Sequence, residues 1–330
     1  MKSKTLVRVV KDWGYPERLN LFAQTPHASG IWDNIEFTDE EVDECDYLII
    51  FKNPKKHIKV RCRYTWLISH EPPIIRNRYF INSFKHFDNV FSYYDCPNTT
   101  VERTHPLIPW MVFKSYDELT NLKLSEAKLA KGHNRITWVT SNQRNLKGQV
   151  ARMNFKDYLL TKSVVMDIFG KGFIEVNDKF DVLFPYKYAM AIENFSHQNY
   201  WSEKIADCLL SYCLPFYWGA PNLEAFLPRE SFVRIDINKP EQALRTILDT
   251  INGDEWEKRI DAISEARNII LNKHQFFPAI SALIQKNTNE QFLNEKRERS
   301  IPANPIPKRI TITDQLSYYK KRISRALALS

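Results

Sequence analysis

Cysteine is scarce in this chain of 330 residues, and its five members are scattered at Cys45, Cys62, Cys96, Cys208 and Cys213. They are odd in number and form no CxxC pair, which argues against a disulfide framework or a structural zinc site. The histidines show neither an HxxxH spacing nor an HExxH motif. The sequence therefore predicts no metal site, and Cys208 and Cys213 are expected to fill the core.

Long apolar runs are also missing. No run approaches the roughly 18 to 20 residues that a membrane-spanning helix needs. The N-terminal segment MKSKTLVRVVKDWGY is basic, but its apolar stretch is too short for a signal peptide. We therefore expect a cytoplasmic protein.

The net charge of +8 is concentrated near the C-terminus, where nine basic residues and two acidic residues follow from Lys296 onward. A neutral body with a basic tail points to an anionic surface more than to nucleic acid. Thr313 is placed to cap a last helix with an apolar face and a basic face. Such a helix suits peripheral contact with anionic lipid on the cytoplasmic membrane face. The alternative is a helix that packs on the body and leaves its lysines in water.

The pattern of strands and helices predicts an α/β fold. Short β-rich runs recur in the first part of the chain, at residues 5–10, 46–51, 64–69 and 89–94. From Arg135 onward, strands alternate with helices, which implies a mostly parallel sheet. The helix predicted after the first of these strands is GQVARMNFKDYLLTK. The run SFVRIDI is predicted as a later strand, and residues 239–271 are predicted to form two helices. Parallel sheets bind ligands at the carboxyl ends of their strands.

Polar residues follow three of these predicted strands: Ser141-Asn142, Gly170-Lys171-Gly172 and Glu193-Asn194. We expect them to meet in one crevice. The segment 186–219 is the most informative, because it reads as strand, polar turn, helix and strand, the layout of a nucleotide-binding βαβ unit. An anion is favoured at the start of such a helix, where Lys204 adds a positive charge.

An ordered set of segments in the second half resembles the α1,3/4-fucosyltransferases of glycosyltransferase family 10, in their bacterial form. The segments are Trp138-Val-Thr-Ser-Asn142 with Arg152 after it, Met166-Asp-Ile-Phe-Gly-Lys-Gly172, Tyr188-Ala-Met-Ala-Ile-Glu-Asn194, Tyr200-Trp-Ser-Glu-Lys204, Leu214-Pro-Phe-Tyr-Trp-Gly219 and Ser231-Phe-Val. They run in the family's order over about 100 residues. The first half resembles the family only loosely.

The resemblance implies a GT-B architecture, in which two Rossmann-like domains face each other across a cleft. It divides the chain into an acceptor-side α/β domain at 1–130, a donor-binding domain at 131–300, and a basic linker and C-terminal helix at 301–330. It also implies an inverting, metal-independent transfer of L-fucose from GDP-fucose. The sequence has no DxD motif of the kind that holds Mn²⁺ in other glycosyltransferases.

The same resemblance assigns donor-binding roles. Arg152 and Lys204 match residues that contact the diphosphate, Glu203 matches the glutamate that holds the ribose hydroxyls, and Tyr200 matches a tyrosine at the nucleotide. Each also has a plainer interpretation. Arg152 may be read as a solvated helix residue, Glu203 and Lys204 as an ordinary first helical turn, and Tyr200 as a core aromatic.

Five further residues are candidates at the strand ends. Asn194 is the better sugar or phosphate contact of the pair Glu193-Asn194, with a turn-forming role as its alternative. Ser141 and Asn142 either bond the diphosphate or only end a strand. Lys171 either contacts the nucleotide or is an exposed turn lysine.

The catalytic base is assigned to Glu71, in Trp66-Leu-Ile-Ser-His-Glu-Pro-Pro73, because family members carry a glutamate before a proline here. An inverting transfer needs a group that takes the proton of the attacking hydroxyl. His70 is a rival, since an imidazole titrates near neutrality.

The resulting hypothesis is a fucosyltransferase that acts on a glycan acceptor, such as an N-acetylglucosamine-type sugar of a surface polysaccharide or lipopolysaccharide. One rival is a GT-B glycosyltransferase that uses another nucleotide sugar. A rival of another class is a non-catalytic protein that binds anionic surfaces through its tail.

Overall fold

The computed structural model of this chain describes residues 4–11, 21–70, 75–96, 100–107, 110–290 and 295–304. These residues fall into two compact units. The first takes its residues from 1–14, 37–104 and 293–330, and the second from 15–36 and 105–292. The predicted domain boundaries at 130 and 300 stay predictions. No helix in the described ranges is long and apolar enough to cross a membrane.

The first unit is built on a parallel sheet. Its strands β1 (Thr5–Val10), β4 (Tyr47–Phe51), β6 (Tyr64–Ser69) and β7 (Asn89–Ser92) lie where the sequence predicts them. The whole sheet has the order β2-β3-β1-β4-β6-β7-β8, with short additions at β2 (Ile31–Trp32), β3 (Ile35–Thr38) and β8 (Glu102–Arg103). All five residues of β4 and all six of β6 are buried, as is typical of strands inside a parallel sheet. The segment η3 (Ile75–His86) lies between β6 and β7.

A second small sheet brings the end of the described chain back to this unit. Strand β14 (Arg297–Ile301) pairs antiparallel with β5 (Ile58–Cys62). Asn304 then donates its backbone N–H to the carbonyl of Pro54 over 2.9 Å. The predicted C-terminal helix lies outside the described residues.

The second unit carries a five-stranded parallel sheet in the order β10-β9-β11-β12-β13. Its strands are β9 (His133–Val139), β10 (Met166–Phe169), β11 (Tyr186–Ile192), β12 (Leu214–Trp218) and β13 (Val233–Arg234). The strands predicted from Arg135 onward are thus present. The last is shorter than the expected run SFVRIDI, whose first residue, Ser231, belongs to a 3-10 turn over Arg229–Ser231.

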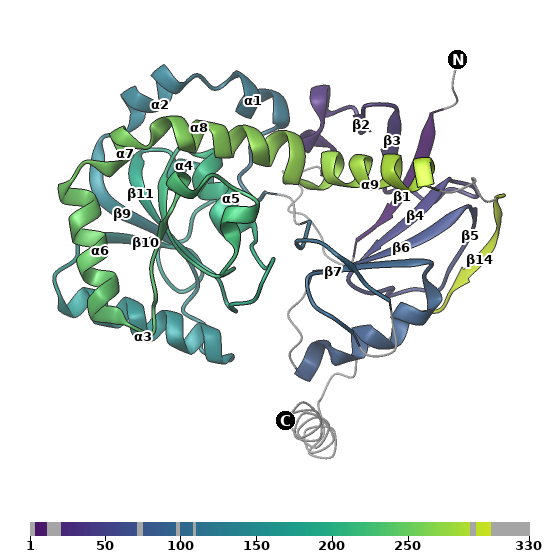
Figure 1. Cartoon of the computed structure of the whole chain (residues 1–330), viewed down its shortest axis with the longest axis horizontal. Helices are drawn as coiled ribbons and strands as arrows, with labels where there is room; N and C mark the ends of the chain where they lie inside the picture. The colour runs from purple at the N-terminus through teal and green to yellow at the C-terminus, as the bar shows by residue number, and fades with distance from the viewer. Residues whose placement is uncertain are drawn as a thin grey trace. The chain divides into compact units, whose positions relative to one another are not determined.

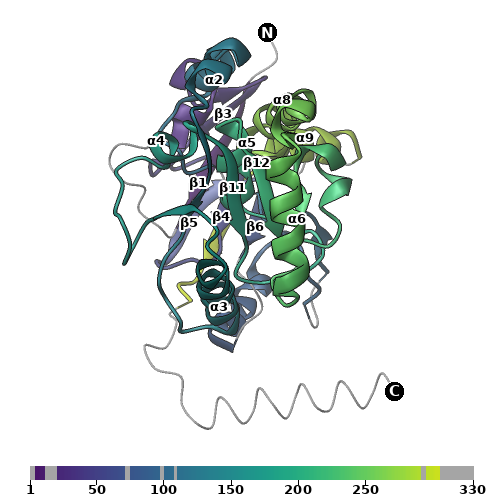
Figure 2. The ribbon, with the colours of Figure 1, turned by 90° about the vertical axis from the view of Figure 1, so that its left-hand side faces the viewer.

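Helices cover both faces of this sheet. Helices α3 (Lys147–Thr161) and α6 (Pro240–Asn252) lie on one face, and α4 (Lys179–Leu183), α5 (Glu203–Leu210) and α8 (Ile260–Ile269) lie on the other (Figure 1). Figure 2 turns the molecule so that α6 comes to the front. The remaining α-helices of the described residues are α1 (Tyr116–Asn121), α2 (Leu124–Ala130), α7 (Glu255–Lys258) and α9 (Phe276–Glu290).

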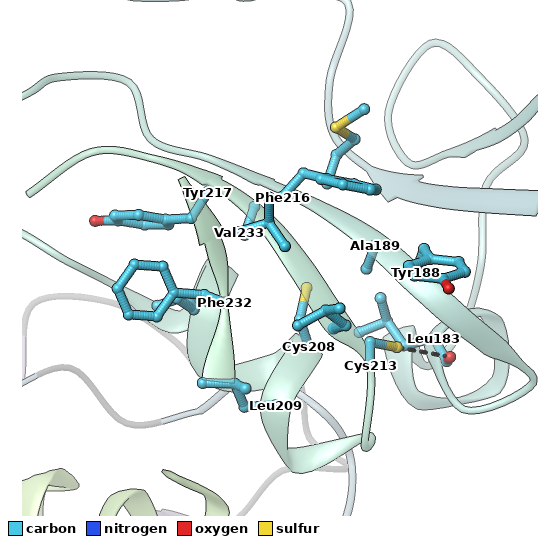
Figure 3. Packing of buried hydrophobic residues seen from close by; sticks show 14 of the residues in the cluster. Leu183, Tyr188, Ala189, Cys208, Leu209, Cys213, Phe216, Tyr217, Phe232 and Val233 are labelled. Atoms are coloured by element: carbon cyan, nitrogen blue, oxygen red, sulfur yellow. Dashed lines mark hydrogen bonds between the residues drawn. The ribbon is translucent and has the colours of Figure 1, made fainter. Parts of the chain in front are cut away.

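The core of the second unit packs α5 against β11 and β12 (Figure 3). Cys208 and Cys213 are buried in it, as predicted, and the Cys213 thiol donates to the carbonyl of Leu183 over 3.1 Å. Burial raises the pKa of the Cys208 thiol well above its usual range, so this cysteine stays protonated. The core therefore holds α5, with its polar first turn, firmly on the sheet.

Candidate functional site

The strand order of the second sheet indicates where a ligand binds: at the carboxyl ends of β9 and β11. Strands β9 and β11 are neighbours, but the helix that follows β9 covers one face and the helix that follows β11 covers the other. In such doubly wound sheets, ligands bind outside the carboxyl ends of the two strands where the order reverses. Ser141 and Asn142 follow β9, and Glu193 and Asn194 follow β11 directly. Four predicted site residues thus lie at the switch point.

Arg152 reaches this edge from α3. Its side chain is buried, and its guanidinium donates to Asn194 Oδ1 over 2.7 Å and, more weakly, to Ser141 Oγ over 3.5 Å. Burial lowers the pKa of the guanidinium, while the charges of Glu193 and Glu203 oppose that shift. The group stays charged at any pH of interest. The structure thus contradicts the interpretation of Arg152 as a solvated helix residue.

A glycine that sequence reasoning missed fixes this arrangement. A Cβ atom at Gly148, in the first turn of α3, would lie 1.7 Å from the backbone oxygen of Asn194. No side chain fits there without moving α3 or the end of β11. The signal in the sequence is a glycine at the start of the helix after the first strand, which nucleotide-binding units use for close approach.

Glu193 organises the first turn of α5. Its carboxylate has no exposed surface and accepts hydrogen bonds from the Ser202 backbone N–H over 2.9 Å and from Ser202 Oγ over 2.7 Å. The Lys204 ammonium lies 3.0 Å from its other oxygen. Burial raises the pKa of Glu193, and Lys204 counteracts part of that rise. Because it is buried, Glu193 acts in this structure by holding Ser202, the N-cap residue of α5, together with Lys204.

Glu203 and Lys204 form an ion pair in that first turn, with 3.2 Å between Lys204 Nζ and Glu203 Oε1. Burial alone would raise the pKa of Glu203, but Lys204 and Lys179 together lower it to about 2. Glu203 is therefore a carboxylate at neutral pH, and a carboxylate only accepts hydrogen bonds. Glu193 and Glu203 raise the pKa of Lys204 although its burial acts in the opposite direction.

Tyr200 lies in a loop that is fastened to the end of β12. Its ring is buried and meets Phe195 edge-on, with 6.0 Å between the ring centroids. Asn199 and Asn222 exchange two hydrogen bonds of 2.8 and 2.7 Å, and Asn199 adopts a left-handed backbone with φ 64°. No local pattern indicates this pair, because 22 other positions separate the two asparagines along the chain.

Lys171 and Asn142 come from neighbouring strand ends. The backbone N–H of Asn142 donates to the carbonyl of Lys171 over 3.1 Å, while both side chains are exposed. Gly172 has φ +82° and touches the Asn142 side chain, which leaves no room for a Cβ atom. The loops after β9, β10 and β11 are thus brought together as the sequence predicts.

Two further charged residues, Lys179 and Asp207, were not predicted. Lys179 Nζ lies 2.8 Å from Asp207 Oδ2, and Asp207 Oδ1 accepts the backbone N–H of Met111 over 2.7 Å. Lys179 and Lys204 line a small cavity of about 20 Å³, partly open to solvent, whose apolar wall includes Trp138 and Ile192. Two ammonium groups thus lie close together near the switch point, where they favour negative charge.

The predicted base, Glu71, lies outside the described residues, so its assignment stays a prediction. Its rival His70 is half-buried, with its ring centroid 5.9 Å from that of Phe51. Within the described ranges, no group of three or more His, Cys, Asp or Glu side chains is arranged to hold a metal ion.

Comparison with known proteins was decisive for the second unit. The sequence model for "Glycosyltransferase family 10 (fucosyltransferase) C-term" matches residues 129–259. Over residues 129–259 the chain is therefore similar to the C-terminal part of family 10. The predicted resemblance is confirmed, and the matched range contains every predicted donor-side residue.

Curated relatives match parts of this chain. A Mus musculus protein named 4-galactosyl-N-acetylglucosaminide 3-alpha-L-fucosyltransferase 9 is 30% identical over 113 residues, which is 32% of this chain and 30% of the relative. The alpha-(1,3)-fucosyltransferase FucT of Helicobacter pylori is 35% identical over 60 residues, which is 18% of this chain and 13% of the relative. The chain thus spans less than a third of the length of these relatives.

Likeness to solved structures extends over most of the chain. A crystal structure of an α1,3-fucosyltransferase with GDP-fucose covers 89% of this chain and 95% of its own, with a TM-score of 0.51 and 17% sequence identity. Similarity at this level concerns the fold. It confirms the predicted GT-B fold class, and each of the two units of the chain carries a largely parallel sheet.

Proposed function

We propose that this protein is a fucosyltransferase that moves L-fucose from GDP-fucose to a hydroxyl group of a glycan. The observation that carries the proposal is the meeting of Arg152, Glu203 and Lys204 at the switch point of the second sheet, within the range similar to family 10. The name of the related solved structure, an α1,3-fucosyltransferase with GDP-fucose, supports the donor.

The proposed reaction breaks the bond between fucose and the diphosphate and forms a bond to the acceptor oxygen. Negative charge grows on the leaving GDP, and a guanidinium fixed beside it stabilises the transition state more than the ground state. Arg152 would supply that charge. Glu203, kept ionised by Lys204 and Lys179, would accept hydrogen bonds from the ribose hydroxyls.

The acceptor hydroxyl must lose its proton as it attacks, and in this proposal Glu71 takes that proton. Attack from the face opposite the diphosphate inverts the configuration at fucose. In this scheme the side chains alone stabilise the leaving-group charge, and no metal ion has a role.

The acceptor is proposed to be an N-acetylglucosamine-type sugar of a surface glycan such as lipopolysaccharide. The name of the Mus musculus relative, a 4-galactosyl-N-acetylglucosaminide 3-alpha-L-fucosyltransferase, supports this class as the first acceptor to assay. Transfer to such a disaccharide with an α1,3 linkage is the expected product.

A thermal-shift titration with GDP, GDP-fucose, GDP-mannose and UDP-galactose tests the donor. A ligand that binds only the folded state raises the melting temperature as its concentration rises. We expect a shift with GDP and GDP-fucose. A shift with UDP-galactose alone would contradict the proposal and favour a glycosyltransferase with another donor, and no shift at all would favour a non-catalytic role.

The basic sequence after residue 304 is proposed to place the enzyme at the cytoplasmic face of a membrane, as a peripheral contact with anionic lipid. Sedimentation with vesicles rich in anionic lipid tests this. The full chain is expected to sediment with the vesicles, and a chain that ends at residue 304 is expected to stay in solution. Equal sedimentation of the two chains would contradict the proposed membrane contact.

A further inference from the structure

The connection between β11 and α5, residues 193–202, is tied to the loop that follows β12. This donor segment leads from the end of β11 to the first turn of α5. At its start, the Glu193 backbone N–H donates to the carbonyl of Trp218 over 2.9 Å. Ser196 Oγ then donates to the carbonyl of Gly219 over 2.8 Å. The first part of the donor segment is thus held on the end of the neighbouring strand.

Asn222 makes two further bonds to the donor segment. Its Oδ1 accepts the backbone N–H of Asn199 over 2.8 Å, and its Nδ2 donates to Asn199 Oδ1 over 2.7 Å. Because a backbone N–H only donates, the orientation of the Asn222 amide is fixed. Asn222 also precedes the 3-10 turn Leu223–Ala225, but its side chain makes no capping bond there. The amide therefore bonds to the donor segment and not to its own turn.

The backbone of Asn199 depends on such support. Its φ of 64° lies in the left-handed region, which residues other than glycine seldom adopt, although asparagine tolerates it better than most. The chain turns at this residue directly before Tyr200 and Ser202, and Ser202 is the N-cap residue of α5. A backbone of this kind persists where surrounding contacts hold it, and it is frequent in segments that bind ligands.

We propose that Asn222 is a positioning residue for the nucleotide donor. It holds the donor segment in one conformation before the nucleotide arrives, so that binding does not have to order the segment between Asn194 and Glu203. Asn222 acts through Asn199 and does not touch the ligand. This inference rests on the proposed function and deepens it, because it names what prepares the donor site. The plainer alternative is that the asparagine pair only stabilises the fold.

Three variants separate these roles. Asn222→Ala removes both bonds to Asn199. Asn199→Gly accepts the left-handed backbone and keeps its N–H, so it removes only the bond between the two side chains. Asn272→Ala is the matched control in the second unit, because Asn272 Oδ1 accepts from the Tyr116 hydroxyl over 2.7 Å and its Nδ2 donates to Asn268 Oδ1 over 2.6 Å. Melting temperatures show whether each variant is folded.

Hydrogen exchange of the full chain without nucleotide measures the order of the donor segment directly. We expect peptides that cover residues 195–202 to exchange about tenfold or more faster in Asn222→Ala than in the wild-type chain. The same peptides should exchange at the wild-type rate in Asn272→Ala. Equal exchange in Asn222→Ala and the wild-type chain would overturn the inference, because the segment would then be ordered without Asn222.

Isothermal titration calorimetry with GDP measures the consequence for binding. We expect the dissociation constant to rise by about tenfold or more in Asn222→Ala, with a less favourable binding entropy, because binding must then order the segment. Asn199→Gly should show a smaller rise, and Asn272→Ala should stay within about twofold of the wild-type value. With GDP-fucose and a galactosyl-N-acetylglucosaminide acceptor, KM for the donor should rise in Asn222→Ala while kcat stays within about twofold.

Two calorimetric results would also overturn the inference. One is a dissociation constant for GDP in folded Asn222→Ala that lies within about twofold of the wild-type value. The other is a loss of affinity that comes entirely from the binding enthalpy, which would make Asn222 a direct contact of the nucleotide. If Asn222→Ala does not fold, the rise expected in Asn199→Gly decides the question. If the wild-type chain binds no guanine nucleotide, the proposed function fails, and hydrogen exchange still decides whether Asn222 orders the segment.

Discussion

At the scale of single residues, the two glutamates near the start of α5 have different environments and therefore different roles. Glu193 is buried beneath Lys204. Glu203 keeps 21% of its side chain exposed, and the charges of Lys204 and Lys179 keep it ionised. Their charge and position could be predicted from the sequence. Which of the two faces a ligand could not, because burial depends on how α5 packs on β11 and β12.

The base assignment leads to a residue-scale prediction. Glu71→Gln removes the proposed proton acceptor without changing the donor residues, so transfer should fall by about 10² to 10⁴-fold in kcat while the affinity for GDP-fucose stays unchanged. Initial rates with a galactosyl-N-acetylglucosaminide acceptor and a calorimetric titration measure the two quantities. His70→Gln is the comparison. If its loss in kcat exceeds that of Glu71→Gln, the base is the histidine.

At the scale of elements, the strongly apolar strands of both units and the main helices of the second unit were predictable, whereas the helical stretches of the first part of the chain were only weakly marked. The strands β1, β4, β6, β9, β11 and β12 follow from runs of β-branched and aromatic residues. Strand β14 was missed because RERSI is mostly polar, and it pairs with β5 more than 200 positions away in the sequence. Such non-local pairing leaves no local pattern.

The helices after residue 239 also differ from expectation. Two helices were predicted over 239–271, whereas the structure has α6, α7 and α8, followed by a wide π-type turn at Ile270–His274. The left-handed backbone of Asp254, with φ 48°, separates α6 from α7. A single aspartate in this conformation is too weak a signal to predict a helix break.

The junction between α3 and β11 gives an element-scale prediction. Gly148→Ala places a methyl group 1.7 Å from the Asn194 oxygen, so α3 must shift and the bond from Arg152 to Asn194 must lengthen. We expect GDP affinity to fall by about tenfold or more, with a lower melting temperature. Gly132→Ala is the control, because its Cβ would meet no atom within 4 Å. Equal GDP affinity in the two variants would contradict this account of the helix contact.

At the scale of the whole molecule, distant segments of the second unit meet in a buried cluster behind the donor loop. His105 stacks on Trp201 with 4.8 Å between ring centroids and meets the ring of His274 at 5.1 Å. The Leu107 backbone N–H donates to His105 Nδ1, and a nitrogen that accepts is unprotonated. No sequence pattern joins positions 105, 201 and 274.

This cluster predicts how stability depends on pH. Burial lowers the pKa of His105 well below its usual range; burial and then Lys273 lower the pKa of His274 to about 4. Between pH 6.5 and 4 the unfolded chain therefore binds more protons than the folded chain, so the free energy of unfolding falls as the pH is lowered through this window. His274 alone contributes up to about 3 kcal/mol.

Urea unfolding at pH 7 and pH 4.5 measures this contribution. The decrease in the free energy of unfolding should be smaller in His274→Phe than in the wild-type chain, because the variant lacks the buried imidazole. Identical decreases in His274→Phe and the wild-type chain would show that the cluster does not resist protonation.

The central claim is that the edge formed by β9 and β11 binds GDP-fucose through Arg152. The most direct test is calorimetric titration of the full chain with GDP-fucose, comparing Arg152→Ala with Arg144→Ala, which removes an exposed arginine that pairs with Asp157 of α3. We predict saturable binding to the wild-type chain and to Arg144→Ala, and a dissociation constant raised by about tenfold or more in Arg152→Ala. Equal affinity in all three proteins, or binding of UDP-galactose in place of GDP-fucose, would contradict the account.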